Sequence, residues 1–264
     1  MPSAPYTTIE RLLASQTPDD VRRGLALAQE EAAKLYPHEA EPLLEIVSAL
    51  FYIDPLDRPD LMPMLDQAIT LVASFGKGVI PSLLHNLEAG DVKAQLAIGQ
   101  ALGRMGAEAV APFVGEFAEG CDQACRAFIL YALGHVQSSE VVRAAPIAIE
   151  AADAADQELR DTAIRAIGKF AESIPSDLLP AELREGFLAK CQERLADANP
   201  AIRAKAVRSL GKMARHGHLN PDEVEQLRAT LSHILGEDED FDWDRAYVVR
   251  REAKEAQENL PAIA

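Results

Sequence analysis

The sequence predicts an all-α fold built from stacked antiparallel helix pairs, and two observations lead to this prediction. The first is composition, because 48% of the 264 residues are hydrophobic but only 5% are aromatic. Ala and Leu are abundant, which favours helix over a β-sandwich. The second is an internal repeat along the chain. A chain of this length can bury a sizeable core, so we expect one solenoid domain over residues 1–264 with about five to six helix pairs.

The repeat consists of four segments that align on a glycine twelve residues after an Asp or Asn. The segments start at Asp91, Asp122, Asp156 and Asn199, and their glycines are Gly103, Gly134, Gly168 and Gly211. Each unit is predicted to be a helix, a turn ending in Asp or Asn, and a second helix that this residue caps. A glycine inside a helix costs about 1 kcal/mol relative to Ala, so its recurrence indicates that a neighbouring helix approaches closely.

The second helix of each unit shows one apolar face. In the third unit this face contains Leu159, Ala163, Ala166, Ile167 and Phe170, which follow the helical period. The aligned positions of the other units are also apolar, so we expect these faces to form a continuous core.

The repeat is regular over residues 76–215 and weaker on both sides. Residues 1–75 are expected to form divergent N-terminal helices, of which 61–75 resembles one more second helix. Residues 216–264 are predicted to form a degenerate, polar capping repeat that contains an acidic loop at 237–244. A polar terminal unit is what a solenoid needs to close its core.

Two sequence features link the chain to a known family. The second helices carry the patterns ALG, AIG and SLG, and an Arg follows the capping residue by four positions in the pairs Asp122–Arg126, Asp156–Arg160 and Asn199–Arg203. This resembles the HEAT-repeat family, in the short form of phycobilisome-lyase-like repeats. The resemblance implies a right-handed α-solenoid, and most HEAT arrays are non-enzymatic scaffolds or adaptors.

In HEAT proteins the second helices line the concave side, so their face opposite the core is the candidate binding surface. We call the candidate residues there the basic stripe: Arg104, Phe128, Tyr131, His135, Arg165, Lys169, Lys205, Arg208 and Lys212. The Lys and Arg residues of the stripe are positively charged, whereas the chain as a whole has a net charge of −16. Arg and aromatic residues are common interface anchors, so we expect a protein or peptide partner with an acidic or extended segment. The alternative is an ordinary solvated face, whose cations stabilise helix C-termini.

The acidic loop is a second candidate. Asp240, Phe241, Asp242 and Trp243 alternate acid with aromatic residues and could dock a partner. The loop could instead be a solvated connection in which Trp243 packs on the cap, or an acidic flap over the fourth unit. A calcium site is not expected, because Arg245 and Arg251 occupy positions that need Gly and an acid.

No catalytic residue, metal site or cofactor is predicted. His216 and His218 lack a defined third ligand, and Cys125 falls in a core position. The alternative function is a HEAT-like enzyme or cofactor handler, similar to DNA glycosylases or phycobilin lyases. The acidic balance argues against nucleic acid, and no signal peptide or membrane span is evident. Three cysteines suit a reducing compartment, so a cytoplasmic location is expected, while the oligomeric state is left open.

Overall fold

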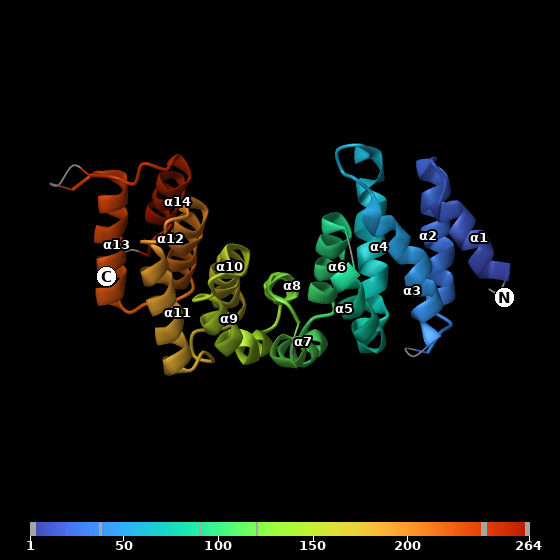
Figure 1. Ribbon diagram of the computed structural model, residues 1–264, viewed down its shortest axis with the longest axis horizontal. Helices are drawn as coiled ribbons and strands as arrows, with labels where there is room; N and C mark the ends of the chain where they lie inside the picture. Colours follow the sequence, from blue (N-terminus) through green and yellow to red (C-terminus); the bar gives the residue numbers. More distant parts are fainter. Residues whose placement is uncertain (1–3, 37–38, 90, 120, 239–241, 262–264) are drawn as a thin grey trace. The chain divides into compact units, whose positions relative to one another are not determined.

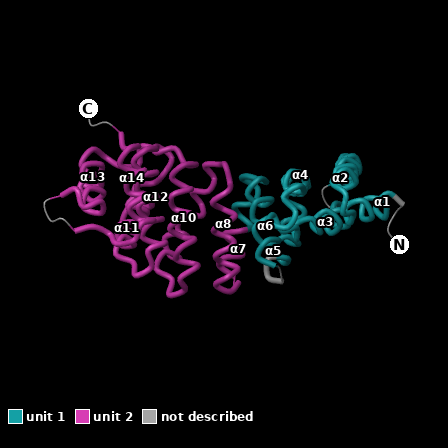
Figure 2. The backbone as a smooth tube through the Cα atoms, turned by 90° about the horizontal axis from the view of Figure 1, so that it is seen from above, with its two compact units in different colours: residues 1–112 teal, residues 113–264 magenta. Residues whose placement is uncertain are grey.

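The chain is helical throughout the part that the structure describes. The computed structural model describes residues 4–36, 39–89, 91–119, 121–238 and 242–261, and these contain fourteen α-helices and no β-strand (Figure 1). The helices follow one another as antiparallel pairs, so the predicted all-α solenoid is confirmed. The chain divides into two compact units, residues 1–112 and 113–264 (Figure 2). The boundary falls inside α7 (Ala107–Glu119), directly after Pro112.

Unit 1 contains six complete helices. They are α1 (Ala4–Leu13), α2 (Pro18–Ala32), α3 (Glu41–Ser48), α4 (Met62–Ser74), α5 (Ile80–Ala89) and α6 (Val92–Arg104), with short 3-10 helices η2 (Ala49–Tyr52), η3 (Pro59–Leu61) and η4 (Gly76–Val79). Within the unit α2 packs on α4 and α4 packs on α6, while α1 packs on α3. Helix α4 matches the second helix expected at residues 61–75 and ends before Gly76, whose φ of +72° favours glycine.

Unit 2 contains the second, third and fourth repeats and the helix pair that follows them. After α7 come α8 (Gln123–Leu133), the 3-10 helix η5 (Ser139–Ala144), α9 (Ala145–Ala151), α10 (Gln157–Ser173), α11 (Ala181–Arg194), α12 (Pro200–Arg215), α13 (Pro221–Leu235) and α14 (Tyr247–Glu258). Helices α8, α10, α12 and α14 pack in sequence as one layer (Figure 1). The degenerate last repeat therefore does form a helix, α14, which packs on α12 and α13.

The four capping residues act as the repeat predicts. The side chains of Asp91, Asp122, Asp156 and Asn199 each accept a hydrogen bond from a backbone N–H in the first turn of the helix that follows. The predicted apolar face of α10 is fully buried, and Cys125 is buried in the aligned position of α8. Local capping and the shared core stripe thus fix where each second helix begins and which face it buries.

The glycine column marks close packing between successive second helices. A Cβ atom added to Gly168 would lie 3.0 Å from Cβ of Ser209 on α12, and one added to Gly211 would lie 3.0 Å from Cβ of Ala256 on α14. The close approach predicted from the sequence is therefore confirmed at these positions. Gly134 differs, because α8 ends at Leu133 and Gly134 is its C-cap rather than an interior residue.

No single helix in the described ranges is long and apolar enough to cross a membrane. Two apolar segments, Pro59–Ser74 and Gly76–Asn86, reach the required length together but are bent by 104° at the break between them.

Candidate functional site

The basic stripe is divided between the two units. Arg104 belongs to unit 1, where its guanidinium reaches back to α4. It donates to the carbonyl oxygen of Asp66 at 3.0 Å, to the Asp66 carboxylate at 2.5 Å and to Thr70 Oγ1 at 2.6 Å. Arg104 thus ties α6 to α4. The other members of the stripe lie within unit 2, on α8, α10 and α12, except His135, which lies in the turn after α8.

At the α8 end of the stripe an arginine lies over an aromatic ring. The Cζ atom of Arg165, on α10, lies 5.3 Å from the ring centroid of Tyr131, a distance suited to a cation–π contact. The Tyr131 and His135 rings are 4.4 Å apart, and His135 Nδ1 lies 2.8 Å from the Tyr131 carbonyl oxygen. Phe128 and Tyr131 are half-buried, whereas Arg165 is exposed. No ion pair of Arg165 with a carboxylate is found in the described residues.

In the middle of the stripe two lysines share one carboxylate. Lys169 of α10 and Lys212 of α12 each lie 2.9 Å from an oxygen of Glu172. Burial alone would raise the pKa of Glu172, but the hydrogen bonds from both lysines outweigh it and the pKa is lowered. Burial also lowers the pKa of the Lys212 ammonium. The group carries two cations and one anion, which leaves one net positive charge.

Two arginines share a second carboxylate at the α14 end. Arg208 of α12 forms a bidentate pair with Glu252 of α14, with N–O distances of 2.8 and 2.5 Å, and Arg251 lies 2.9 Å from the same carboxylate. Glu252 is 2% exposed, so these arginines compensate a buried charge. The remaining cation of the stripe, Lys205, pairs with Asp161 of α10.

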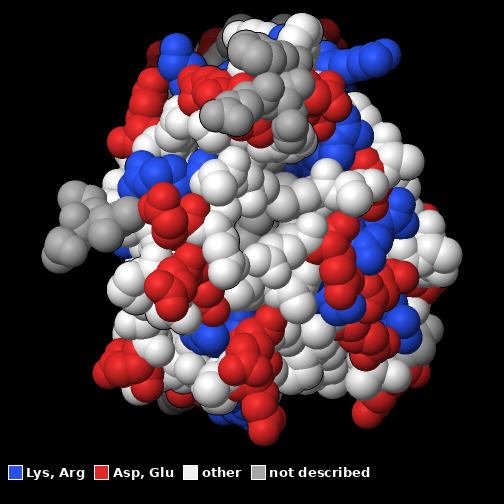
Figure 3. Space-filling view, turned by 90° about the vertical axis from the view of Figure 1, so that its left-hand side faces the viewer, with Lys and Arg blue, Asp and Glu red and all other residues white. Residues whose placement is uncertain are grey.

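A small cavity connects these two groups. It has a volume of about 190 Å³ and is lined by Glu172, Arg208, Gly211, Lys212, Arg215, Glu252, Glu255 and Ala256. The lining therefore mixes cations of α12 with acids of α10 and α14. Figure 3 looks onto the end of unit 2 that carries α13 and α14, and shows acidic and basic side chains next to one another there as well. The sequence predicts a positively charged stripe on an acidic chain. Because its cations pair with neighbouring acids, the net positive charge of the stripe is smaller than the sequence predicts.

The arginine that follows each capping residue has a role that the sequence pattern did not reveal. In α10, α12 and α14 its Nη1 atom donates to the carbonyl oxygen two residues before the cap. The pairs are Arg160–Ala154 at 2.6 Å, Arg203–Asp197 at 2.9 Å and Arg250–Asp244 at 2.6 Å. This bond closes the turn between the two helices of one repeat.

The same arginines also connect neighbouring repeats. Arg160 donates through Nε to the Asp197 carboxylate at 2.8 Å, and Arg203 binds both oxygens of Asp244 at 2.7 and 2.9 Å. Hydrogen bonding to Arg203 lowers the pKa of Asp244. Burial raises the pKa of Asp197, but hydrogen bonds from Asn199 and Arg160 outweigh it and lower that pKa.

Asp197 and Asp244 therefore each bind one arginine of this series by the carbonyl and the preceding one by the carboxylate, and Arg194 also lies 3.8 Å from the Asp197 carboxylate. We call this series the arginine ladder.

The acidic loop is described only in part. Asp240 and Phe241 lie outside the described residues. Asp242 is exposed, and Trp243 is 51% exposed and lies against Gly236. Asp244 at the end of the loop binds Arg203 of the fourth unit, so the loop is attached there by an ion pair.

Two further candidates from the sequence, His218 and Cys125, are buried in the core of unit 2. His218 is 2% exposed, and its Nε2 atom lies 2.9 Å from the Ala171 carbonyl oxygen. Cys125 and Cys191 are buried. No group of three or more His, Cys, Asp or Glu side chains in the described ranges is arranged to hold a metal ion.

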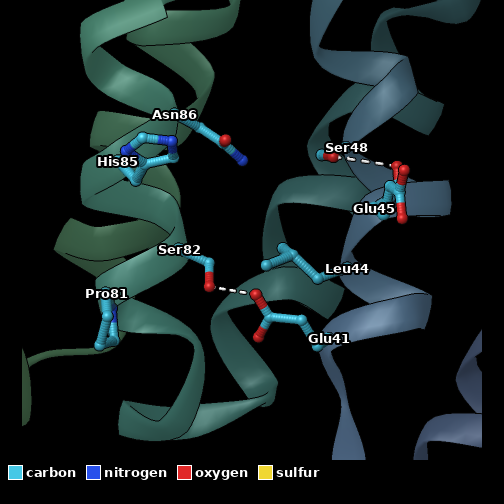
Figure 4. A pocket seen from close by; sticks show the side chains of 8 residues that line it. All are labelled: Glu41, Leu44, Glu45, Ser48, Pro81, Ser82, His85 and Asn86. Carbon is cyan, nitrogen blue, oxygen red and sulfur yellow. Dashed lines mark hydrogen bonds between the residues drawn. The ribbon is translucent and has the colours of Figure 1, made fainter.

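Unit 1 has a larger cavity, of about 490 Å³, between α3 and α5. Figure 4 shows Glu41 and Glu45 on one wall, with Ser82, His85 and Asn86 on the other. None of the sequence-predicted residues lines this cavity.

Comparison with known proteins bears on the fold. No protein-family model matches the chain, and no curated protein matches it. Solved structures do match, among them the complex of CpcE and CpcF of phycocyanin lyase from Nostoc sp. PCC7120. That match has 19% identity and a TM-score of 0.54, and covers 68% of this chain and 98% of the other.

Two further matches are repeat proteins. A designed armadillo repeat protein in complex with the peptide (KR)4 matches at 14% identity and a TM-score of 0.53, over 97% of this chain and 99% of that one. Kap121p bound to Ste12p matches at 13% identity and a TM-score of 0.60, over 96% of this chain and 28% of that one. The fold is that of HEAT and armadillo repeat proteins. The resemblance expected from the sequence is confirmed at this level.

Proposed function

We propose that the chain is a non-enzymatic scaffold or adaptor, and that the unit 2 part of the basic stripe binds an extended, acidic segment of a protein partner. The fold supports a binding role, because two of the structural neighbours were solved with a bound peptide or protein partner. Solenoids present long surfaces formed by successive repeats, which suit extended ligands.

The observation that carries the proposal is an excess of cations over carboxylates in two groups of ion pairs, one around Glu172 and one around Glu252. Glu172 is shared by Lys169 and Lys212, and Glu252 is shared by Arg208 and Arg251. Each group has one cation more than it has acids. A partner carboxylate can therefore approach either group and gain a favourable interaction while the existing ion pairs remain intact.

Arg165 completes the surface. Its guanidinium is exposed, lies over Tyr131 and has no ion pair with a carboxylate in the described residues. The ring contact orients the planar guanidinium while its N–H groups stay available to a carboxylate or a backbone carbonyl. Arg and Tyr are the residue types that most often dominate binding energy at protein interfaces.

The test uses two labelled twelve-residue peptides, one alternating Glu and Val and one alternating Lys and Val, with binding followed by fluorescence anisotropy. The expected result is tighter binding of the Glu peptide, even though a chain of net charge −16 attracts the Lys peptide overall. Arg165→Glu should weaken binding of the Glu peptide about tenfold or more, as expected for an anchor residue.

The matched control is Arg228→Glu, which makes the same charge change on α13 and should leave binding within about twofold. Equal losses in the two variants would mean that net charge alone governs binding, and would contradict the proposal. Tight binding of duplex DNA with a steep salt dependence would instead favour the glycosylase-like alternative.

A further inference from the structure

A second surface, in unit 1 and independent of the proposed function, is formed by the loop that precedes α4 and by the first turns of α6. Leu56 in this loop is 91% exposed, and Tyr52 and Val92 beside it are 60% and 63% exposed. Leu96 lies one turn after Val92 on the same face of α6 and is also exposed. Large apolar side chains exposed as a group indicate an interaction site more often than an isolated one does.

Contacts between the elements place these residues together. The helix η2, which ends at Tyr52, packs on α6. Lys93, the neighbour of Val92, forms an ion pair with Asp54, and the Asp54 carboxylate accepts a hydrogen bond from the Leu56 backbone N–H at 2.9 Å. The ion pair therefore holds the base of the loop against the first turn of α6.

The loop is also fixed on its other side. Arg58 donates to the side chain and the carbonyl oxygen of Gln16, both at 2.9 Å, and binds the two carboxylate oxygens of Asp60 at 3.0 and 2.8 Å. Leu56 thus lies between two attachments, one to α6 and one to the turn between α1 and α2. A loop that is already ordered loses less conformational entropy when a partner binds.

The charge around the apolar residues selects the kind of partner. Asp54, Asp57 and Asp91 lie near Lys93, the neighbour of Val92, and Asp60 pairs with Arg58 in the same loop. Both cations are already paired with acids of this group, so the rim has two net negative charges. A second copy of the chain would bring two acidic rims together, which is unfavourable. A partner with apolar residues flanked by Lys or Arg is complementary.

We propose that Tyr52, Leu56, Val92 and Leu96 form a docking surface for a basic amphipathic helix of a protein partner. The apolar face of such a helix would lie along Val92 and Leu96 with Leu56 at its side. Its Lys or Arg residues would face Asp57 and Asp91. The i, i+4 spacing of Val92 and Leu96 matches the spacing of apolar residues on a partner helix.

The experiment uses the full chain and a labelled eighteen-residue helical peptide with a Leu face and Lys at the remaining positions. A peptide with Glu in place of Lys is the charge control. Leu56→Ser should weaken binding of the Lys peptide about tenfold or more, because a central apolar anchor is lost. Leu178→Ser is the matched variant, since Leu178 is 54% exposed in unit 2, and it should change binding less than twofold.

Hydrogen exchange with and without the Lys peptide locates the contact, and protection of residues 53–61 and 91–97 is the expected result. Because the loop is exposed, Leu56→Ser should leave the unfolding midpoint unchanged, so a loss of binding would not reflect unfolding. Equal effects of the two Leu variants on binding of the Lys peptide, equal protection of residues 53–61 and 91–97 by the Glu peptide, or a dimer that Leu56→Ser dissociates would each overturn the proposal. Each of these outcomes is measured at the unit 1 surface or through Leu56, so binding of the Glu peptide to the basic stripe of unit 2 does not affect them.

Discussion

Replacing Gly168 with Ala tests the close packing of successive second helices. The added Cβ would lie 2.4 Å from Oγ, 3.0 Å from Cβ and 3.1 Å from Cα of Ser209. Ser209 is 2% exposed, and its hydroxyl donates to the Ile164 carbonyl oxygen at 2.8 Å, so the side chain cannot rotate away without losing that bond. Because the Cα atom belongs to the α12 backbone, α12 must move relative to α10.

The magnitude follows from opposing contributions. Overpacking of this kind costs about 1–3 kcal/mol. Breaking the buried Ser209 hydrogen bond adds about 1–3 kcal/mol if its hydroxyl is left without an acceptor. The higher helix propensity of Ala returns at most about 1 kcal/mol. We therefore expect Gly168→Ala to lower the free energy of unfolding by about 1–5 kcal/mol, which corresponds to a Tm lower by several degrees.

The assay is urea unfolding followed by circular dichroism and by fluorescence of Trp243, the single tryptophan of the chain. Gly115→Ala is the control, because Gly115 is an exposed residue of α7 and an added Cβ would meet nothing within 4 Å. That variant should be stabilised by up to about 1 kcal/mol. In Gly168→Ala combined with Ser209→Gly, the two losses should be less than additive. Equal stabilisation by both alanines would refute the packing argument.

Two further predictions concern buried polar groups. Arg203→Met removes the bidentate pair with Asp244 and should lower the free energy of unfolding by about 1.5–3 kcal/mol in urea titrations. The control is Arg22→Met, which removes an exposed pair on α2 and should change the free energy of unfolding by less than about 0.5 kcal/mol. Equal effects of the two variants would contradict a stabilising arginine ladder. Burial, with His216 and Arg184 nearby, lowers the pKa of His218. The folded state therefore resists protonation while the unfolded state binds a proton below about pH 6.5, so stability present above that pH should decrease as the pH falls. Urea midpoints at pH 7.5 and 5.5 should show a smaller decrease for His218→Gln than for the natural chain, and an identical decrease would refute this role.

The features that the sequence predicts correctly depend on local rules. A capping Asp such as Asp156 acts within one helical turn, and the core stripe from Leu159 to Phe170 follows from helical periodicity. The glycine column adds one contact between helices, because only a small residue permits it. For these reasons the solenoid and most second helices could be derived without the structure.

The ion pairs of the basic stripe could not be derived from the sequence in this way. Whether Arg208 meets Glu252 depends on the register between α12 and α14, and these two residues are 44 positions apart. Lys212 of α12 likewise forms an ion pair with Glu172 of the neighbouring helix α10. Alignment of the repeats places each cation on a face but does not show which acid of the neighbouring repeat lies opposite. The arginine after each cap was visible as a pattern, yet its hydrogen bonds needed the geometry of the following turn.

The ion pairs of the arginine ladder all run in the same direction along the repeats of unit 2. Arg160 and Arg203 each reach towards the C-terminus, to an aspartate of the following turn. Ending the chain before Asp244 would leave Arg203 without its carboxylate, whereas starting it after α10 would leave Asp197 without Arg160. The corresponding position before the third unit is Ala154, so Arg126 meets no aspartate there and stacks on Phe117 instead. A repeat inserted into this array would therefore need to bring an arginine for its successor and an aspartate for its predecessor.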